Sequence, residues 1–313
     1  MMRSLLTSGL AMMVLSAFFF ALTDVLVKFV SPEFAVTEIA FFRFVIGGAI
    51  LLLLMAPRRI SFRGNRTPIL VARGVVGTLT FLSLLKSISM IPLANALVLF
   101  YTFPIFASFF AFILFRESLS GKEVILILIG LGGIYILIDP GTHVFNWGDI
   151  YGLLAGCSAG ISVVLIRKLR ETNNPFVIYF YYCLTGSIIS FPFVLKGVRM
   201  HGPDQLLLLI ILGIVFLIAQ LLMTQGFKFC KASEGSVILM SEVVLTGIAG
   251  VLIFKDPLSL HFMTGAFFIL GSGVGLNLMN RRVRLAQRSR ATGGILGGCG
   301  DGGQSRVSAE CRE

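Results

Sequence analysis

The stretch Phe115-Arg116-Glu117-Ser118-Leu119-Ser120 returns 139 residues later as Phe254-Lys255-Asp256-Pro257-Leu258-Ser259. In both copies an aromatic, a basic and an acidic residue are followed at one spacing by Leu-Ser. Further pairs keep the same offset: Gly74 with Gly213, Lys86 with Gln225, and Gly132 with Gly271. Chance similarity between apolar segments does not explain polar residues in register. A period this long predicts a chain built from two copies of one unit.

Composition identifies the environment in which both copies fold. Hydrophobic residues make up 56% of the 313 residues, charged residues only 13%, and the mean hydropathy is +0.93. A soluble domain carries about 25% charged residues, so this chain cannot cover a water-facing surface with so little charge. The composition excludes a cytosolic enzyme, a disordered chain and a nucleic-acid-binding domain. The net charge of +11 then reflects loop orientation in a multi-pass membrane protein.

Ten apolar runs are candidates for membrane spans, since a membrane helix needs about 20 mostly apolar residues. They cover residues 8–30, 36–55, 70–90, 93–115, 122–138, 148–166, 175–195, 205–227, 234–254 and 261–279. With the N-terminus in the cytoplasm, 20 of the 26 Lys and Arg residues lie nearer the inner face, which is the bias typical of cytoplasmic loops. We therefore predict an all-α integral membrane protein with ten transmembrane helices and both termini in the cytoplasm.

The predicted spans divide equally between the two copies, with five helices in residues 8–138 and five in residues 148–279. An odd number of spans in each copy gives the copies opposite topology in the membrane. Inverted repeats of this kind build many secondary transporters, whose substrate sites lie near the midplane where the repeats meet. Residues 280–313 form a third segment, a basic collar at the inner leaflet followed by a Gly- and Ser-rich tail that we expect to be disordered.

Several short motifs follow one another in a fixed order along about residues 8–280. They are Phe41-Phe42-Arg43-Phe44, Arg73-Gly74, Ile91-Pro92-Leu93-Ala94-Asn95-Ala96, Phe103-Pro104, Arg116-Glu117-Ser118-Leu119-Ser120 and Gly130-Leu131-Gly132-Gly133-Ile134. In their order and spacing the chain resembles the drug/metabolite transporter superfamily, of the EamA type. The resemblance implies ten helices in two five-helix repeats. Lys255-Asp256-Pro257 departs from the Gly-Glu pair that is more typical of the second repeat.

Ionisable side chains inside the spans are the best functional pointers, because each costs roughly 2.5–3.5 kcal/mol in hydrocarbon unless it is paired or hydrated. Asp24, Arg43 and Lys86 lie toward the outer ends of their helices. Two cations that face one cavity, Arg43 and Lys86, would favour a carboxylate or another anionic group on a substrate. The alternative for this outer group, which also contains Lys28 and Glu38, is a salt-bridge cluster at the lipid headgroups.

Glu242 is expected near the midplane and pairs with Phe103 at the offset of 139. The next residue, Pro104, frees the carbonyl of Phe100 from its helical hydrogen bond and predicts a kink where the two copies face each other. A carboxylate beside such broken backbone can bind a cationic substrate group, or hold a proton that is released as a cavity changes sides. The alternative is a permanently protonated Glu242 that donates to a neighbouring carbonyl.

Other residues at similar depths are candidates for the lining of a pore. They are Asn95, Tyr101, Gln220, Gln225 and Ser241, and Tyr101 could stack on a planar substrate, although such rings more often face lipid or core. Glycines recur every four residues at Gly152, Gly156 and Gly160, and again at Gly271 and Gly275, which predicts close helix packing. The histidines and cysteines show no metal-ligand spacing, so we expect neither a metal nor a cofactor.

These features favour a secondary transporter that moves a small organic metabolite across a bacterial-type inner membrane by alternating access. The resemblance implies substrates such as amino acids, nucleosides or S-adenosylmethionine-like compounds, and Arg73-Gly74 with Pro92-Leu93-Ala94 resembles the subgroup of S-adenosylmethionine-type carriers. The expected partners are the metabolite, protons, membrane lipids and a second copy in a homodimer. The alternatives are a channel, a non-transporting scaffold, or a membrane-embedded enzyme, for which the spans lack suitable histidines.

Overall fold

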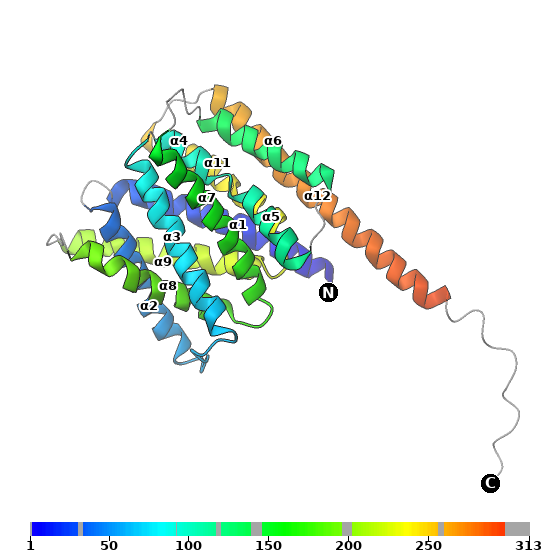
Figure 1. The fold of residues 1–313 in the computed structure, drawn as a ribbon, viewed down its shortest axis with the longest axis horizontal. Helices are drawn as coiled ribbons and strands as arrows, with labels where there is room; N and C mark the ends of the chain where they lie inside the picture. Colours follow the sequence, from blue (N-terminus) through cyan, green and yellow to red (C-terminus); the bar gives the residue numbers. More distant parts are fainter. Residues whose placement is uncertain are drawn as a thin grey trace, which may run out of the picture.

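The structure, a computed structural model, describes residues 2–30, 34–91, 93–116, 120–138, 146–195, 202–255 and 260–297 (Figure 1). All regular structure in these ranges is helical. The helices are α1 (Met2–Val30), α2 (Val36–Met55), α3 (Thr67–Ile88), α4 (Leu93–Phe100), α5 (Phe103–Phe115), α6 (Gly121–Ile138), α7 (Trp147–Leu169), α8 (Pro175–Val194), α9 (Pro203–Gly226), α10 (Ala232–Leu239), α11 (Ser241–Phe254) and α12 (Leu260–Gly297).

The outward-facing surface of these helices is apolar. Leu53, Leu252 and Phe267 each expose more than 70% of their surface. Exposure of such large apolar side chains is unfavourable in water and favourable in lipid. Within the described ranges, eight helical segments are long and apolar enough to cross a membrane, and Leu260–Leu276 is a shorter apolar segment. The prediction of an all-α membrane protein is confirmed.

Two of the predicted spans, 93–115 and 234–254, are each broken into two helices. The first break lies between α4 and α5, directly before Pro104, the second residue of α5. A proline has no backbone N–H and cannot continue the preceding helix, so this break follows from the sequence. The second break lies at Met240, between α10 and α11, where the chain has no proline.

The same hydroxyl contact stabilises both breaks. Thr102 Oγ1 donates to the Leu99 carbonyl at 2.6 Å, and Ser241 Oγ donates to the Ile238 carbonyl at 2.7 Å. Each hydroxyl shares its carbonyl with a backbone N–H, that of Thr102 or of Met240, at the end of the preceding helix. The two hydroxyl residues are 139 positions apart, and so are the two carbonyl residues. The offset found in the sequence therefore relates the two breaks in atomic detail.

α5 and α11 also end alike. The residue after each helix, Arg116 or Lys255, has the left-handed backbone conformation, with φ of 52° and 58°. Such a residue commonly ends a helix and is most often glycine, whereas a basic side chain there complements the negative end of the helix dipole. These are the basic residues of the two repeated stretches. The acidic ones, Glu117 and Asp256, lie outside the described residues.

Helices from the two halves of the chain pack against each other in matching pairs. α3 packs along α7 as α1 packs along α9, and α5 packs on α7 as α11 packs on α1. α2 packs on α8, and α6 lies beside α12, which extends beyond the bundle (Figure 1). α12 continues through the basic collar to Gly297, so the first residues of the tail that we expected to be disordered, residues 293–313, are helical. Residues 298–313 lie outside the described part of the chain, and disorder there remains a prediction.

Glycines on α7 allow it to approach the first break closely. A Cβ atom at Gly156 would lie 2.8 Å from the Leu99 carbonyl oxygen, and one at Gly160 would lie 2.7 Å from the Ala107 nitrogen. Real Cβ atoms essentially never come this close to another atom, so the packing role predicted for the glycines of α7 is confirmed. For Gly271 the prediction is wrong, because a Cβ there would meet no atom of the described residues within 4 Å, whereas one at Gly275 would lie 3.0 Å from the Leu126 side chain.

Candidate functional site

Two acidic side chains from different halves of the chain meet beside the second break. Asp24, on α1, accepts a hydrogen bond of 2.8 Å from the Thr246 hydroxyl on α11. Asp24 is exposed on α1, and Glu242, the second residue of α11, is half-buried within electrostatic range of it. The buried Tyr101 lies within the same range of both carboxyl groups. Three of the predicted site residues, Asp24, Tyr101 and Glu242, therefore form one cluster, to which Thr246 is added.

The break between α10 and α11 shapes the surroundings of Glu242. It creates a helix N-terminus within the apolar segment Ala232–Ile253 and places Glu242 in the first turn. The positive end of a helix dipole stabilises a carboxylate there by about 0.3–1 kcal/mol, less than the roughly 2.5–3.5 kcal/mol that a charge costs in hydrocarbon. Two neighbouring carboxylates also repel each other. A bound proton or a cationic group relieves both costs, so the cluster is suited to bind either one.

Arg43 lies in a cage of aromatic rings and is 8% exposed. Its Cζ atom is 4.0 Å from the centroid of the Phe216 ring, 4.4 Å from that of Phe81 and 5.0 Å from that of Phe44. Each such contact contributes about 0.5–2 kcal/mol. Nε and Nη2 of Arg43 are buried and have no hydrogen-bond partner in the part of the chain that the structure describes.

Lys86, which the sequence analysis groups with Arg43, is exposed in the last turn of α3. It follows Phe81 by five residues, which turns it about 140° around the helix from the ring that contacts Arg43. The structure thus does not bring Lys86 and Arg43 together. The outer alternative also involved Glu38, whose carboxylate accepts from the Ala35 N–H at 2.8 Å at the start of α2.

A second buried arginine, Arg73, also lies against an aromatic ring and was not among the predicted site residues. It is 3% exposed, and its Cζ atom lies 4.4 Å from the centroid of the Tyr182 ring. Its Nε and Nη1 atoms are buried without a hydrogen-bond partner among the described residues. The buried hydroxyl of Tyr179 lies beside the Cys183 thiol. The signal for Arg73 was its place inside the predicted span 70–90, which corresponds to the second turn of α3.

A separate pocket of about 780 Å³ opens between α1, α9 and the turn from α7 to α8. Arg170, 7% exposed, lines it and donates hydrogen bonds to the Asn173 carbonyl and to the side-chain oxygen of Gln225. Burial lowers the pKa of Arg170 to about 10. The predicted pore-lining residue Gln225 is thus placed in this pocket.

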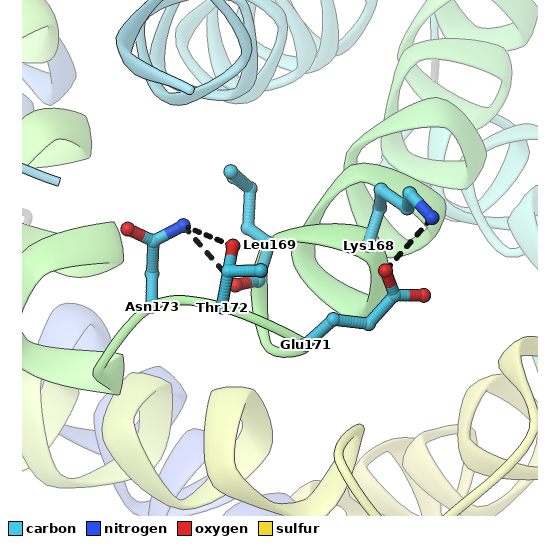
Figure 2. Close-up of polar contacts among 5 residues, drawn as sticks. All are labelled: Lys168, Leu169, Glu171, Thr172 and Asn173. Carbon is cyan, nitrogen blue, oxygen red and sulfur yellow. Dashed lines mark hydrogen bonds and ion pairs between the residues drawn. The ribbon is translucent and has the colours of Figure 1, made fainter. Parts of the chain in front are cut away.

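The turn that forms one wall of this pocket is held by polar contacts (Figure 2). Lys168 pairs with Glu171 at 2.7 Å, and the Asn173 amide donates to the Thr172 hydroxyl at 3.1 Å and to the Leu169 carbonyl at 3.3 Å (Figure 2). The Asn173 amide oxygen also accepts from the Asn65 N–H at 2.7 Å. The turn is therefore tied to the loop before α3.

The remaining predicted residues are buried in other helices. Asn95 lies in α4 and Gln220 in α9, where the side-chain oxygen of Gln220 has no partner among the described residues. Pro104 lies at the first break, next to Phe103, whose ring centroid is 6.3 Å from that of Tyr101.

Comparison with known families decides the relationship. The model of the EamA-like transporter family matches the chain twice, over residues 7–139 and over residues 146–278. The chain belongs to the EamA-like transporter family. The predicted resemblance to this branch of the drug/metabolite transporter superfamily is confirmed.

Similar curated proteins in and around this family carry transporter names. The chain is 27% identical over 279 residues to the pseudopaline exporter CntI of Pseudomonas aeruginosa, covering 88% of this chain and 98% of that protein. It is 22% identical to the S-adenosylmethionine uptake transporter of Rickettsia prowazekii, covering 84% and 90%. It is 26% identical to the human solute carrier family 35 member G1, covering 85% and 78%.

A solved structure shares the EamA fold of this chain. It matches with a TM-score of 0.75 over 87% of this chain and 99% of its own length, at 20% sequence identity. The likeness concerns the fold alone. The family and the names of the relatives are those of transporters, which supports a membrane protein that is not an enzyme and that handles a small molecule.

Proposed function

We propose that this protein is a secondary active transporter that moves a small organic metabolite across the cytoplasmic membrane by alternating access. The observation that carries the proposal is the meeting of Asp24 and Glu242 beside a broken helix. Relatives named as a pseudopaline exporter and an S-adenosylmethionine uptake transporter support an organic metabolite as the substrate class. One relative is named as an exporter and the other as an uptake transporter, so we propose the binding site and its chemistry and assign no direction of transport.

The proposed architecture has ten membrane spans and both termini in the cytoplasm, with α6 and α12 added to the eight candidate spans. Residues 8–138 and 148–279 form two five-helix units of opposite topology, and residues 280–313 form a cytoplasmic collar and tail. The matched packing of α3 with α7 and of α1 with α9 supports this arrangement, as do the two breaks related by the offset of 139.

In the proposed mechanism, Asp24 and Glu242 take up a proton or a cationic group of the substrate on one side of the membrane. Neutralising the pair removes the repulsion between the carboxylates and allows the site to close. The breaks between α4 and α5 and between α10 and α11 then act as hinges, because few helical hydrogen bonds cross them. Opening to the other side returns water to the carboxylates and releases the proton or the substrate. A proton gradient across the inner membrane is the proposed energy source.

Flux into proteoliposomes tests this proposal. The protein is reconstituted, and uptake of radiolabelled amino acids, nucleosides and S-adenosylmethionine is measured with and without an imposed pH gradient. We expect saturable flux of one substrate class that rises with the gradient, and at least a tenfold loss of gradient-driven flux in Glu242→Gln and in Asp24→Asn. The matched control is Asp204→Asn, which changes an exposed carboxylate in the first turn of α9 and should keep wild-type flux.

The alternatives give different results in the same assay. Flux that does not saturate would indicate a channel, and no flux of any class would support a non-transporting scaffold. Saturable flux that is equally gradient-dependent in Glu242→Gln would overturn the proposed role of the acidic cluster.

A further inference from the structure

Arg43 and Arg73 are linked to each other through aromatic rings. The Cζ atom of Arg43 lies 5.0 Å from the Phe44 ring centroid, the Phe44 and Tyr182 centroids are 5.0 Å apart, and the Cζ atom of Arg73 lies 4.4 Å from the Tyr182 centroid. Neither guanidinium forms an ion pair with a residue that the structure describes. Two positive charges are therefore buried in one apolar cluster without a described negative charge to balance them.

The atoms that lack partners have the arrangement of a carboxylate receptor. Nε and Nη2 of Arg43 lie on the same edge of the planar guanidinium, and this edge can hold a carboxylate with two parallel N–H···O bonds. Arg73 contributes Nε and Nη1, which lie on different edges of its guanidinium and can each donate a single hydrogen bond. The nearby Tyr179 hydroxyl lies beside the Cys183 thiol. The Tyr179 hydroxyl lies against α2 at Gly47, one turn beyond Arg43, since a Cβ there would be 3.1 Å from it.

A purely structural role does not account for this arrangement. Aromatic rings stabilise the flat face of a guanidinium, but they leave the N–H groups at its edge unbonded. A buried charge whose N–H groups are unbonded lowers the stability of a protein. An apolar side chain of similar size at the same position would leave the protein more stable. Space is also kept for Arg73, because a Cβ at Gly77 would collide with its Nη1 atom.

The cluster adjoins α1, the helix that carries Asp24. Phe216, on which Arg43 stacks, lies 5.7 Å from Phe20 between ring centroids, and Phe20 is on α1, one turn before Asp24. The arginines and the carboxylates thus flank the contact between α1 and α9. A molecule that carries a negative group and a positive group would find a complement for each on the two sides of this contact.

We propose that Arg43 and Arg73 form the subsite that receives the carboxylate of the transported molecule, and that the substrates are organic acids and zwitterions rather than neutral nucleosides. This inference rests on the proposed function, since it assigns a substrate class to the same transporter. The edges of both guanidinium groups are closed to solvent in this structure. The carboxylate therefore reaches them when α2 and α3 move apart from α8 and α9 during the transport cycle.

Ligand-induced thermal stabilisation of the purified full-length protein tests the inference. The probes are matched sets: L-methionine with L-methioninamide, S-adenosylmethionine with its decarboxylated form, and adenosine as the neutral compound. A ligand that binds only the folded state raises the melting temperature as its concentration exceeds its dissociation constant. We expect a shift with at least one carboxylate, and at least a tenfold higher concentration requirement for its amide or decarboxylated partner.

Variants identify the residues that hold the carboxylate. Arg43→Gln and Arg73→Gln should each raise the concentration for a half-maximal shift at least tenfold, and Arg43→Lys should give an intermediate loss, because it keeps the charge and loses the paired N–H groups. Arg58→Gln is the control, since Arg58 is exposed just after α2. If Arg43→Gln does not purify as a monodisperse protein, the response of Arg43→Lys decides.

The outcomes separate this inference from the proposed function. Equal shifts with acids and amides, a shift with adenosine alone, an unchanged response in the arginine variants, or no shift with any probe would each overturn the carboxylate subsite. Saturable flux of adenosine that is the same in Arg43→Gln would refute the subsite and leave the transporter standing. If carboxylates bind through Arg43 but are not transported into proteoliposomes, the result would support the carboxylate subsite and contradict the proposed transport function.

Discussion

Replacing Gly156 by alanine is expected to push α7 away from the break between α4 and α5. In the structure a Cβ at this position would lie 2.8 Å from the Leu99 carbonyl oxygen and 2.7 Å from the Thr102 hydroxyl. The carbonyl belongs to the backbone and already accepts the Thr102 hydroxyl, so neither atom can turn aside freely. Ordinary contact begins at 3.4 Å, so the helices must separate by more than half an ångström at this point.

Two opposing contributions set the size of the effect. Alanine stabilises a helix relative to glycine by about 1 kcal/mol, whereas overpacking of a tight interface costs about 1–3 kcal/mol. The free energy of unfolding should therefore fall by about 0–2 kcal/mol. The matched control is Gly132→Ala in α6, where a Cβ would meet nothing within 4 Å. That variant keeps the gain in helix stability without the collision, so the difference between the two variants, about 1–3 kcal/mol, measures the packing alone.

Thermal unfolding of both variants in the same detergent provides the measurement. Gly156→Ala should melt below the wild type and Gly132→Ala at or above it, by a few degrees in each case. Gly271→Ala in α12, which also has open space around it, should behave like Gly132→Ala. If Gly156→Ala melts at or above the temperature of Gly132→Ala, α7 is not packed against the break as closely as we describe, and the reasoning fails.

Two further substitutions test single contacts. Thr246→Val removes the hydroxyl that donates to Asp24, so we expect the free energy of unfolding to fall by about 1–3 kcal/mol. Thr246→Ser keeps a hydroxyl and should have the wild-type melting temperature. Equal melting temperatures of the valine and serine variants would contradict the contact. Glu123 is buried, caps the start of α6 and pairs with Lys231 at 3.2 Å. Glu123→Ala should therefore cost about 1–3 kcal/mol by the same assay, whereas Lys231→Met should cost less, and the reverse order would refute the capping role.

The sequence predicted the helices well because a membrane leaves few choices for an apolar chain. Every backbone polar group must be bonded within its own segment, so a long apolar run becomes a helix. The first break was signalled by Pro104. The second break, at Met240, had no such signal, because only a hydroxyl at Ser241 and the packing around α10 and α11 mark it.

The candidate site was only partly predictable. Asp24 and Glu242 were selected one by one, as ionisable residues in apolar runs, and their meeting depends on the packing of α1 against α11. Arg73 lay near a predicted boundary, and the burial that makes it notable comes from α8, more than a hundred residues later in the chain. Lys86 was grouped with Arg43 by depth alone, which does not determine the face of the helix on which a residue lies.

The exchange of packing partners between the halves has a consequence for how the protein is made. Arg73 enters the membrane before Tyr182 has been synthesised, and Arg43 enters before Phe216. At about 5–20 residues per second, the ribosome needs roughly 5–20 s to pass from Arg73 to Tyr182. During that interval Arg43 and Arg73 lie in the bilayer without the rings of Phe216 and Tyr182 that cover them in the folded protein. We therefore expect the early helices to stay in contact with the insertion machinery until α7, α8 and α9 have been synthesised. Folding of the first half of the chain is then completed by packing against the second half.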